Sequence, residues 1–113
     1  MESHLKVSKN TIFAFLTSII DPELNVDIVS LGLIYEIVLD DTGKNGSSVL
    51  VKMTLTTPGC PLAGMFYQRI REGIEALDGV DPKKVEVEFV FDPPWHPGLM
   101  TEEAKLQLGW EES

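Results

Sequence analysis

The stretch LAGMFYQRIREGIEAL, residues 62–77, is the most informative part of the sequence about the fold class. Its apolar side chains recur three and four residues apart, which places them along one face of an α-helix. These side chains are Leu62, Met65, Phe66, Ile70, Ile74 and Leu77. Pro61 precedes the stretch and Asp78-Gly79 follows it, where glycine suits a helix end. A helix with one apolar face needs a partner layer, so the flanking sequence is expected to supply a sheet.

Three flanking segments have the alternating pattern of β-strands. Residues 34–40 and 49–55 are separated by the turn-forming residues 40–46, and together they predict a hairpin. One face of the first strand is expected to carry Tyr35, Ile37 and Leu39. Residues 85–91 predict a third strand, which ends at Asp92-Pro93-Pro94 because proline cannot donate to a strand ladder.

Two further helices complete the predicted order. Residues 9–20 have helical apolar spacing, with Ser8 as the N-cap and Asp21-Pro22 as the stop. A last helix is expected to begin after Thr101 and to end before Gly109. The order α-β-β-α-β-α predicts an α+β two-layer sandwich, in which a small three-stranded sheet has both long helices packed on one face.

Size and composition indicate one soluble domain over residues 8–110, with terminal fringes at 1–7 and 111–113. No apolar run approaches the roughly 20 residues that span a bilayer, so no membrane association is expected. The N-terminal residues lack the features of a secretory signal. The one cysteine cannot form an internal disulfide, which fits a reducing compartment. These features predict a cytoplasmic protein.

Charge argues against a nucleic-acid partner. The chain has 18 acidic and 9 basic residues, a formal net charge of -9. Such a surface repels phosphate backbones and lacks the basic stripe that nucleic-acid binding requires.

The thiol of Cys60 is the first candidate for chemistry. Cys60 lies in the turn Thr56-Thr57-Pro58-Gly59-Cys60-Pro61, where a strand ends and a helix begins. A helix terminus contributes about 0.3–1 kcal/mol to an anion, less than the 1.36 kcal/mol that equals one pKa unit. The thiol is therefore better suited to ligate a metal or sulfur than to act as a free nucleophile. Burial as a small hydrophobic residue is the structural alternative.

Two other loops carry polar groups with a possible role in chemistry. Asp21-Pro22-Glu23-Leu24 presents two carboxylates around a proline, although ordinary helix-stop chemistry also explains it. Asp92-Pro93-Pro94-Trp95-His96-Pro97 is a rigid loop, in which a structural role for His96 is favoured over a ligand role. The first loop and the turn at 56–61 are expected to meet in one pocket. Gly32, between Leu31 and Leu33, is expected to supply backbone freedom at the entry to the first strand.

Four ordered blocks in this sequence resemble the small iron-sulfur cluster assembly family of the SufT and PaaD type. The blocks are Asp21-Pro22-Glu23-Leu24, Val29-Ser30-Leu31-Gly32-Leu33-Ile34-Tyr35, Thr56-Thr57-Pro58-Gly59-Cys60-Pro61 and Asp92-Pro93-Pro94-Trp95. The resemblance implies an α+β fold and a role in maturing iron-sulfur proteins. It also implies a pocket made by Asp21, Glu23, Leu24, Thr56, Thr57 and Cys60. The chain departs from the family pattern at Ser30, where aspartate is common, and at His96, where threonine, serine or asparagine is usual.

One cysteine limits the mechanism, because an iron-sulfur cluster usually needs four thiolate-type ligands. The interpretation is a non-enzymatic assembly or delivery factor in which Cys60 holds iron or cluster transiently, with no tightly bound cofactor. Its expected partners are iron-sulfur carrier or scaffold proteins and apo-client proteins, and a homodimer would offer two thiols. The alternatives are an enzyme that uses Cys60 as nucleophile, with His96 as a base, and a purely structural adaptor.

Overall fold

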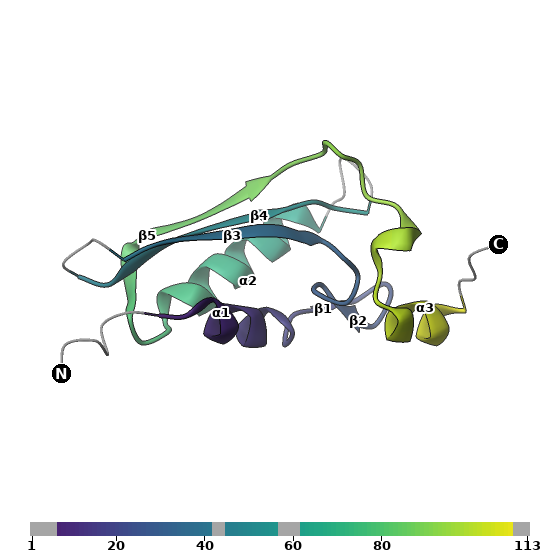
Figure 1. The fold of residues 1–113 in the computed structure, drawn as a ribbon, viewed down its shortest axis with the longest axis horizontal. Coiled ribbons are helices and arrows are strands. Elements are labelled where there is room, and N and C mark those ends of the chain that lie inside the picture. Colours follow the sequence, from purple (N-terminus) through teal and green to yellow (C-terminus); the bar gives the residue numbers. More distant parts are fainter. Residues whose placement is uncertain (1–6, 42–44, 57–61, 110–113) are drawn as a thin grey trace.

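The computed structural model describes residues 7–41, 45–56 and 62–109. Its elements in chain order are α1 (Lys9–Leu16), β1 (Ile20–Asp21), β2 (Val26–Asp27), β3 (Ile34–Asp40), β4 (Ser47–Met53), α2 (Ala63–Glu75), β5 (Val80–Phe89), the 3-10 helix η2 (Pro97–Leu99) and α3 (Glu102–Leu108). The three longer strands form one sheet in the order β3-β4-β5, and β1 and β2 form a two-stranded sheet. Helices α1 and α2 lie on the same side of the larger sheet (Figure 1), which confirms the predicted α+β class.

Strands β3 and β4 pair antiparallel, as the predicted hairpin requires, whereas β4 and β5 pair parallel. A parallel neighbour needs a crossover connection, and α2 supplies it. The central strand β4 thus sets both registers, since Val51 lies opposite Ile37 on one side and Val87 on the other.

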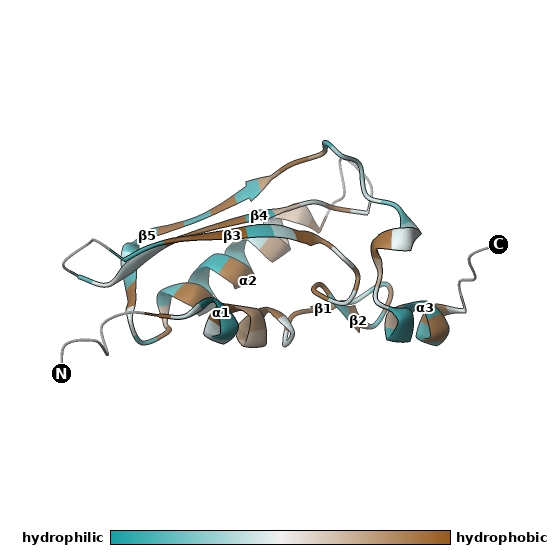
Figure 2. Cartoon of the chain, viewed as in Figure 1, coloured by the Kyte–Doolittle hydropathy of each residue, from teal (hydrophilic) through white to brown (hydrophobic). Residues whose placement is uncertain are grey.

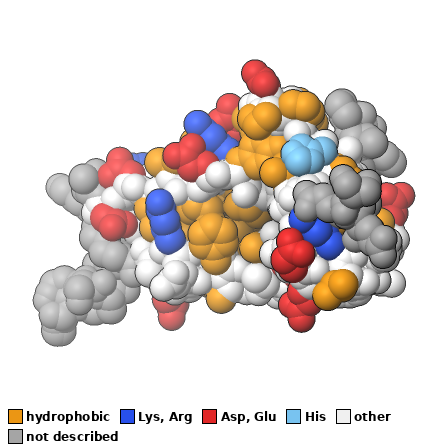
Figure 3. All heavy atoms as spheres, turned by 45° about the vertical axis from the view of Figure 1, so that its right-hand side comes forward, with side chains coloured by type: hydrophobic (Ala, Val, Ile, Leu, Met, Phe, Trp, Pro, Cys, Tyr) orange, Lys and Arg blue, Asp and Glu red, His pale blue; other side chains and the backbone are white. Residues whose placement is uncertain are grey.

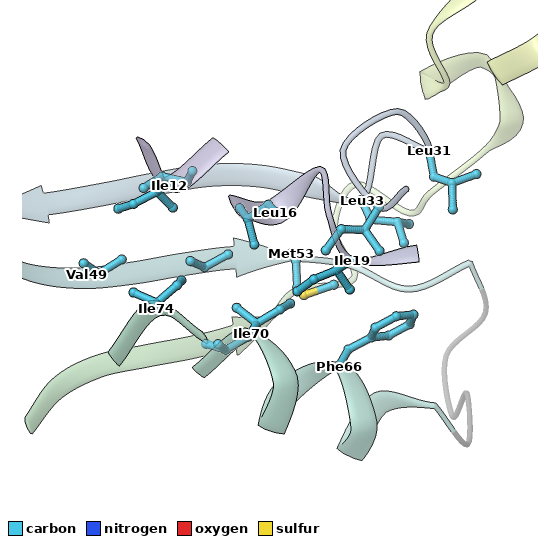
Figure 4. Packing of buried hydrophobic residues seen from close by; sticks show 14 of the residues in the cluster. Ile12, Leu16, Ile19, Leu31, Leu33, Val49, Met53, Phe66, Ile70 and Ile74 are labelled. Carbon is cyan, nitrogen blue, oxygen red and sulfur yellow. The ribbon is translucent and has the colours of Figure 1, made fainter. Parts of the chain in front are cut away.

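The core lies between the sheet and the two helices. Figure 4 shows side chains of α1, α2 and β4 pointing into this space. Phe66, Ile70 and Ile74 of α2 are at most 1% exposed, and so are Ile12 and Leu16 of α1. Brown and teal alternate around the turns of α2 in Figure 2, as expected for a helix with one buried face. Burial of each such side chain contributes about 1.5–3 kcal/mol.

Helix α1 is shorter than the sequence predicts, because it ends at Leu16 and not at residue 20. The hydroxyls of Thr17 and Ser18 donate to the carbonyls of Ala14 and Phe15. Such local hydroxyl bonds compete with the helical ladder. Asp21 then belongs to a hairpin between β1 and β2, so its assignment with Pro22 as the stop of the first helix was wrong.

A bulge changes which residues share a face of β3. The register passes from Ile34 opposite Met53 to Glu36 opposite Lys52, so Tyr35 is an extra residue. Ile34 therefore shares the buried face with Ile37, and the assignment of Tyr35 to that face was wrong. Strand β5 also begins earlier than residue 85, since Val80 pairs with Ser47.

The predicted ends of α1 and α3 at Ser8, Thr101 and Gly109 are confirmed, whereas the cap predicted at Gly79 was wrong, because α2 ends at Glu75 and Ala76 is its C-cap. Ser8 and Thr101 accept hydrogen bonds from the amides of Thr11 and Ala104, and Gly109 has the left-handed conformation after α3. Val7, assigned to the N-terminal fringe, is buried and donates its amide to Ser47 Oγ. None of the helices within the described ranges is long and apolar enough to cross a membrane.

Candidate functional site

The carboxylate of Asp21 organises the turn between β1 and β2. Its Oδ1 accepts hydrogen bonds from the amides of Glu23 (2.8 Å) and Leu24 (3.3 Å), and its carbonyl accepts from the amide of Asn25 (2.7 Å). Asn25 completes the turn with a positive φ of 59°, a conformation that asparagine tolerates better than most residues. Asp21 is therefore a turn-organising residue, and its side chain is only 3% exposed.

The residues after Asp21 have different surroundings. Glu23 is exposed, so its carboxylate can move to meet a ligand, whereas Leu24 is half-buried against the hydrophobic core. No described residue donates a hydrogen bond to the second oxygen of Asp21, Oδ2. The turn thus offers one fixed carboxylate oxygen and one mobile carboxylate.

Backbone hydrogen bonds bring the end of β4 to the same end of the molecule as this turn. The amide of Thr54 donates to Leu33 (2.8 Å), Leu33 donates to Ile28 (3.1 Å), and Ile28 donates to Ile19 (3.0 Å), two residues before Asp21. Three consecutive backbone bonds therefore connect the segment before Thr56 to the segment before Asp21.

The predicted pocket is described only in part. Thr56 lies half-buried at a bend three residues after β4 ends. Thr57 and Cys60 lie outside the described residues, so the expected meeting of the thiol with Asp21 and Glu23 stays a prediction. Among the described residues, no group of three or more His, Cys, Asp or Glu side chains could hold a metal ion.

Thr54 is a polar residue of this region that the sequence analysis did not identify. It is fully buried, and its Oγ1 has no hydrogen-bond partner within the part of the chain that the structure describes. A buried hydroxyl without a partner is uncommon, because its desolvation is not compensated. The strand pattern gave it no weight, because in the predicted strand 49–55 Thr54 alternates with the apolar residues Met53 and Leu55 and was expected to face away from the core.

The proline loop is held against the segment that contains Gly32. Trp95 Nε1 donates to the carbonyl of Leu31 (2.7 Å), and the hydroxyl of Tyr35 donates to the carbonyl of Pro93 (2.8 Å). His96 is exposed, and its Nδ1 accepts from the amide of Gly98 (3.1 Å). His96 therefore caps η2, which agrees with the structural role favoured from the sequence.

A polar hollow of about 250 Å³ lies between the β1–β2 hairpin and α3. Asp27, Ser30 and Glu103 are among its lining residues, and Gln107 donates to the carbonyl of Asn25 across it (3.3 Å). On α2, a hydrogen bond to Glu75 raises the pKa of Arg71.

Comparison with known proteins places these features in one family. Residues 9–87 match the family described as iron-sulfur cluster assembly protein. A protein of Porphyromonas gingivalis named Fe-S protein maturation auxiliary factor is 37% identical, and the match covers 97% of this chain and 99% of that protein. The Fe-S protein maturation auxiliary factor YitW of Bacillus subtilis is 40% identical, over 89% of this chain and 93% of its own.

A solved structure has the same fold. It is a domain of unknown function from Bacillus anthracis, with a TM-score of 0.79 and 36% sequence identity. The likeness covers 90% of this chain and 92% of that one.

Proposed function

The chain belongs to the iron-sulfur cluster assembly protein family, and from this membership we propose that it is an assembly or delivery factor that supports the maturation of iron-sulfur proteins. One observation carries the proposal, namely the match along nearly the whole chain to a relative named as a maturation auxiliary factor.

The proposed ligand for iron or cluster is the thiol of Cys60. The residues proposed to surround it are Asp21, Glu23, Leu24, Thr56 and Thr57. In this assignment Cys60 coordinates iron or a cluster transiently, as cargo. A single thiolate supplies one of the four ligands that a cluster usually needs, so the remaining ligands come from a partner. Because this chain supplies too few ligands, we expect the iron or cluster to stay on it only briefly and then to pass to the partner.

The surroundings of Asp21 support this assignment. Two backbone amides hold Oδ1 in place, while Oδ2 has no described donor. Carboxylate oxygen is a suitable additional ligand for iron. The exposed Glu23 is positioned to contact either the metal or a basic group on a partner.

The partners that fit this role are iron-sulfur carrier or scaffold proteins, which donate the cluster, and apo-clients, which receive it. We place the chain in the cytoplasm, where its free thiol would stay reduced. The role needs no turnover of a substrate by the chain itself, so the factor is not an enzyme.

The test is complementation in a deletion strain of the source organism. The activities of several iron-sulfur enzymes are measured in lysates after expression of wild type, Cys60→Ser or Asp21→Asn. We expect both variants to fold and to leave the enzymes inactive. Restoration by Cys60→Ser equal to wild type would instead show that the chain acts as an adaptor.

Alkylation of the purified protein separates a ligand from a catalytic nucleophile. Under anaerobic conditions, ferrous iron is expected to slow alkylation of Cys60 by iodoacetamide at neutral pH. An alkylation rate that ferrous iron leaves unchanged would remove the ligand role.

A further inference from the structure

The larger sheet has two edge strands, β3 and β5, and their residues differ in how well they protect the edge. At β5, the hydroxyl of Tyr67 donates to Glu86 Oε1 (2.9 Å), and Arg71 donates to that hydroxyl (2.9 Å). Strand β5 also contains Pro82 and the exposed pair Lys83-Lys84. Proline, lysine and covering side chains are the usual devices that prevent an edge strand from pairing with another chain.

The other edge, β3, has fewer such devices, namely the bulge at Tyr35 and two acidic residues. Its sequence, IYEIVLD, contains no proline, lysine or arginine. From Ile34 to Leu39 its backbone pairs with β4, and no other described segment provides a hydrogen-bonding backbone partner. Helix α1 lies below β3 on the near side of the sheet in Figure 1. The bulge at Tyr35 restricts the open edge to its later residues.

Apolar surface accompanies this open edge. Figure 3 shows hydrophobic side chains gathered between β3 and α1. Phe13 of α1 is 38% exposed, and Val38 on the outer face of β3 is 40% exposed. An exposed strand with apolar surface beside it is typical of an interaction site.

We propose that β3 pairs antiparallel with β3 of a second copy, around a two-fold axis at Ile37. An antiparallel pair with such an axis keeps the helices of both copies on one face of a continuous sheet. The exposed Phe13 lies on that face, so the same contact is expected to cover it in both copies.

The charges of β3 select this register. With the axis at Ile37, Glu36 lies opposite the second copy's Val38, and Ile37 lies opposite its own equivalent. With the axis at Val38, Glu36 would lie opposite the second copy's Asp40. With the axis at Glu36, two glutamates would face each other. Like charges directly opposite each other destabilise a strand pair, so the Ile37 register is favoured.

The interface consists of one strand and part of one helix, so it is small. We therefore expect a dimer that depends on concentration and not an obligate one. This inference is independent of the proposed function, because it rests on the edge of the sheet and not on Cys60. An experiment that refutes the dimer does not affect the proposed function, and the reverse also holds.

The test is sedimentation velocity on the full chain from micromolar to near-millimolar concentration. Wild type is expected to shift from monomer to dimer. Val38→Glu places two like-charged pairs across the axis and is expected to raise the dissociation constant about tenfold or more. Val38→Lys places lysine opposite Glu36 and is expected to keep the dimer.

Charge exchange tests the register directly. The double variant Glu36→Lys/Val38→Glu restores opposite charges across the axis and is expected to recover the dimer. Leu106→Glu is the matched control, since Leu106 is 81% exposed on α3 and the change has the same charge. It is expected to leave dimerisation unchanged, and circular dichroism checks that every variant is folded.

The proposal is overturned if wild type stays monomeric across the whole range, which would leave the edge for another protein. It is also overturned if Val38→Lys weakens the dimer as much as Val38→Glu does, or if the double variant fails to recover it. Loss of the dimer in Leu106→Glu would place the interface on α3.

Discussion

Replacement of Gly32 by alanine tests how the proline loop is joined to the rest of the molecule. Gly32 has a positive φ of 80°, a region that alanine rarely adopts. A Cβ built on Gly32 would overlap the carbonyl oxygen of Leu99 and lie 2.8 Å from the Cβ of Leu99. Both obstacles are backbone or backbone-proximal atoms, so a rotamer change cannot relieve them.

The expected loss of stability has two parts. The left-handed conformation costs a residue with a Cβ about 1–2 kcal/mol. Displacement of the chain around Leu99 adds about 1–3 kcal/mol, the usual cost of overpacking. The sum is about 2–5 kcal/mol, and each kcal/mol lowers the melting temperature of a domain of this size by about 4 °C. Gly32→Ala is therefore expected to melt about 8–20 °C below wild type.

Two glycines provide matched controls in the same thermal melts. Gly109 has a similar φ of 75°, and no atom of the described residues lies within 4 Å of a Cβ at this position, so Gly109→Ala reports the conformational cost alone. Gly64 lies in α2 with open space around it, and Gly64→Ala is expected to stabilise by about 0.5–1 kcal/mol. If Gly32→Ala and Gly109→Ala melted at the same temperature, the argument from close approach to Leu99 would be refuted.

Substitutions at three further positions test individual side chains by urea unfolding. Thr54→Val replaces a buried hydroxyl without a described partner by a methyl group, and we expect it to stabilise by about 1 kcal/mol; a loss of stability would reveal a partner. Asp21→Ala removes two hydrogen bonds from the turn and is expected to lower the free energy of unfolding by about 1–3 kcal/mol. Asp21→Asn keeps an acceptor and is expected to lower it by less. Equal losses in the two variants would contradict the turn-organising role. Trp95→Phe leaves the Leu31 carbonyl without its donor and is expected to cost about 1–3 kcal/mol, and a neutral effect would mean that the indole hydrogen bond contributes nothing.

Local patterns predicted the elements whose formation depends on nearby residues. Helix α2 has its apolar residues at helical spacing, and Phe66, Ile70 and Ile74 are all buried in the structure. The caps at Ser8, Thr101 and Gly109 depend on bonds within one helical turn, so the sequence contains the whole interaction.

Features that depend on distant residues were not predicted. The parallel pairing of β4 with β5 is decided by how α2 crosses the sheet, and the bulge at Tyr35 appears only when β3 is aligned with β4. The β1–β2 hairpin has two residues in each strand, too few for an alternating pattern to be recognised.

In the candidate site, too, features that depend on nearby residues could be predicted, and features that depend on distant residues could not. Asp21 and Glu23 could be selected because carboxylates beside a proline are a local signal. The bonds to Oδ1 of Asp21 come from amides two and three residues later and are therefore local, whereas the burial of Asp21 and the unpartnered hydroxyl of Thr54 depend on the packing of segments far apart in the chain. Which carboxylate is fixed and which is mobile was therefore not readable from the sequence.

The segment 28–33 joins the two halves of the candidate site, because it bonds to Ile19 on one side and to Thr54 on the other. The same segment is held by Trp95 through Leu31 and is in close contact with Leu99 through Gly32. The proline loop is therefore expected to position the proposed site through this segment. A change at Gly32 is expected to impair complementation in the deletion strain more than its loss of stability explains. Gly109→Ala, which lacks such a contact, is expected to complement fully at the same temperature.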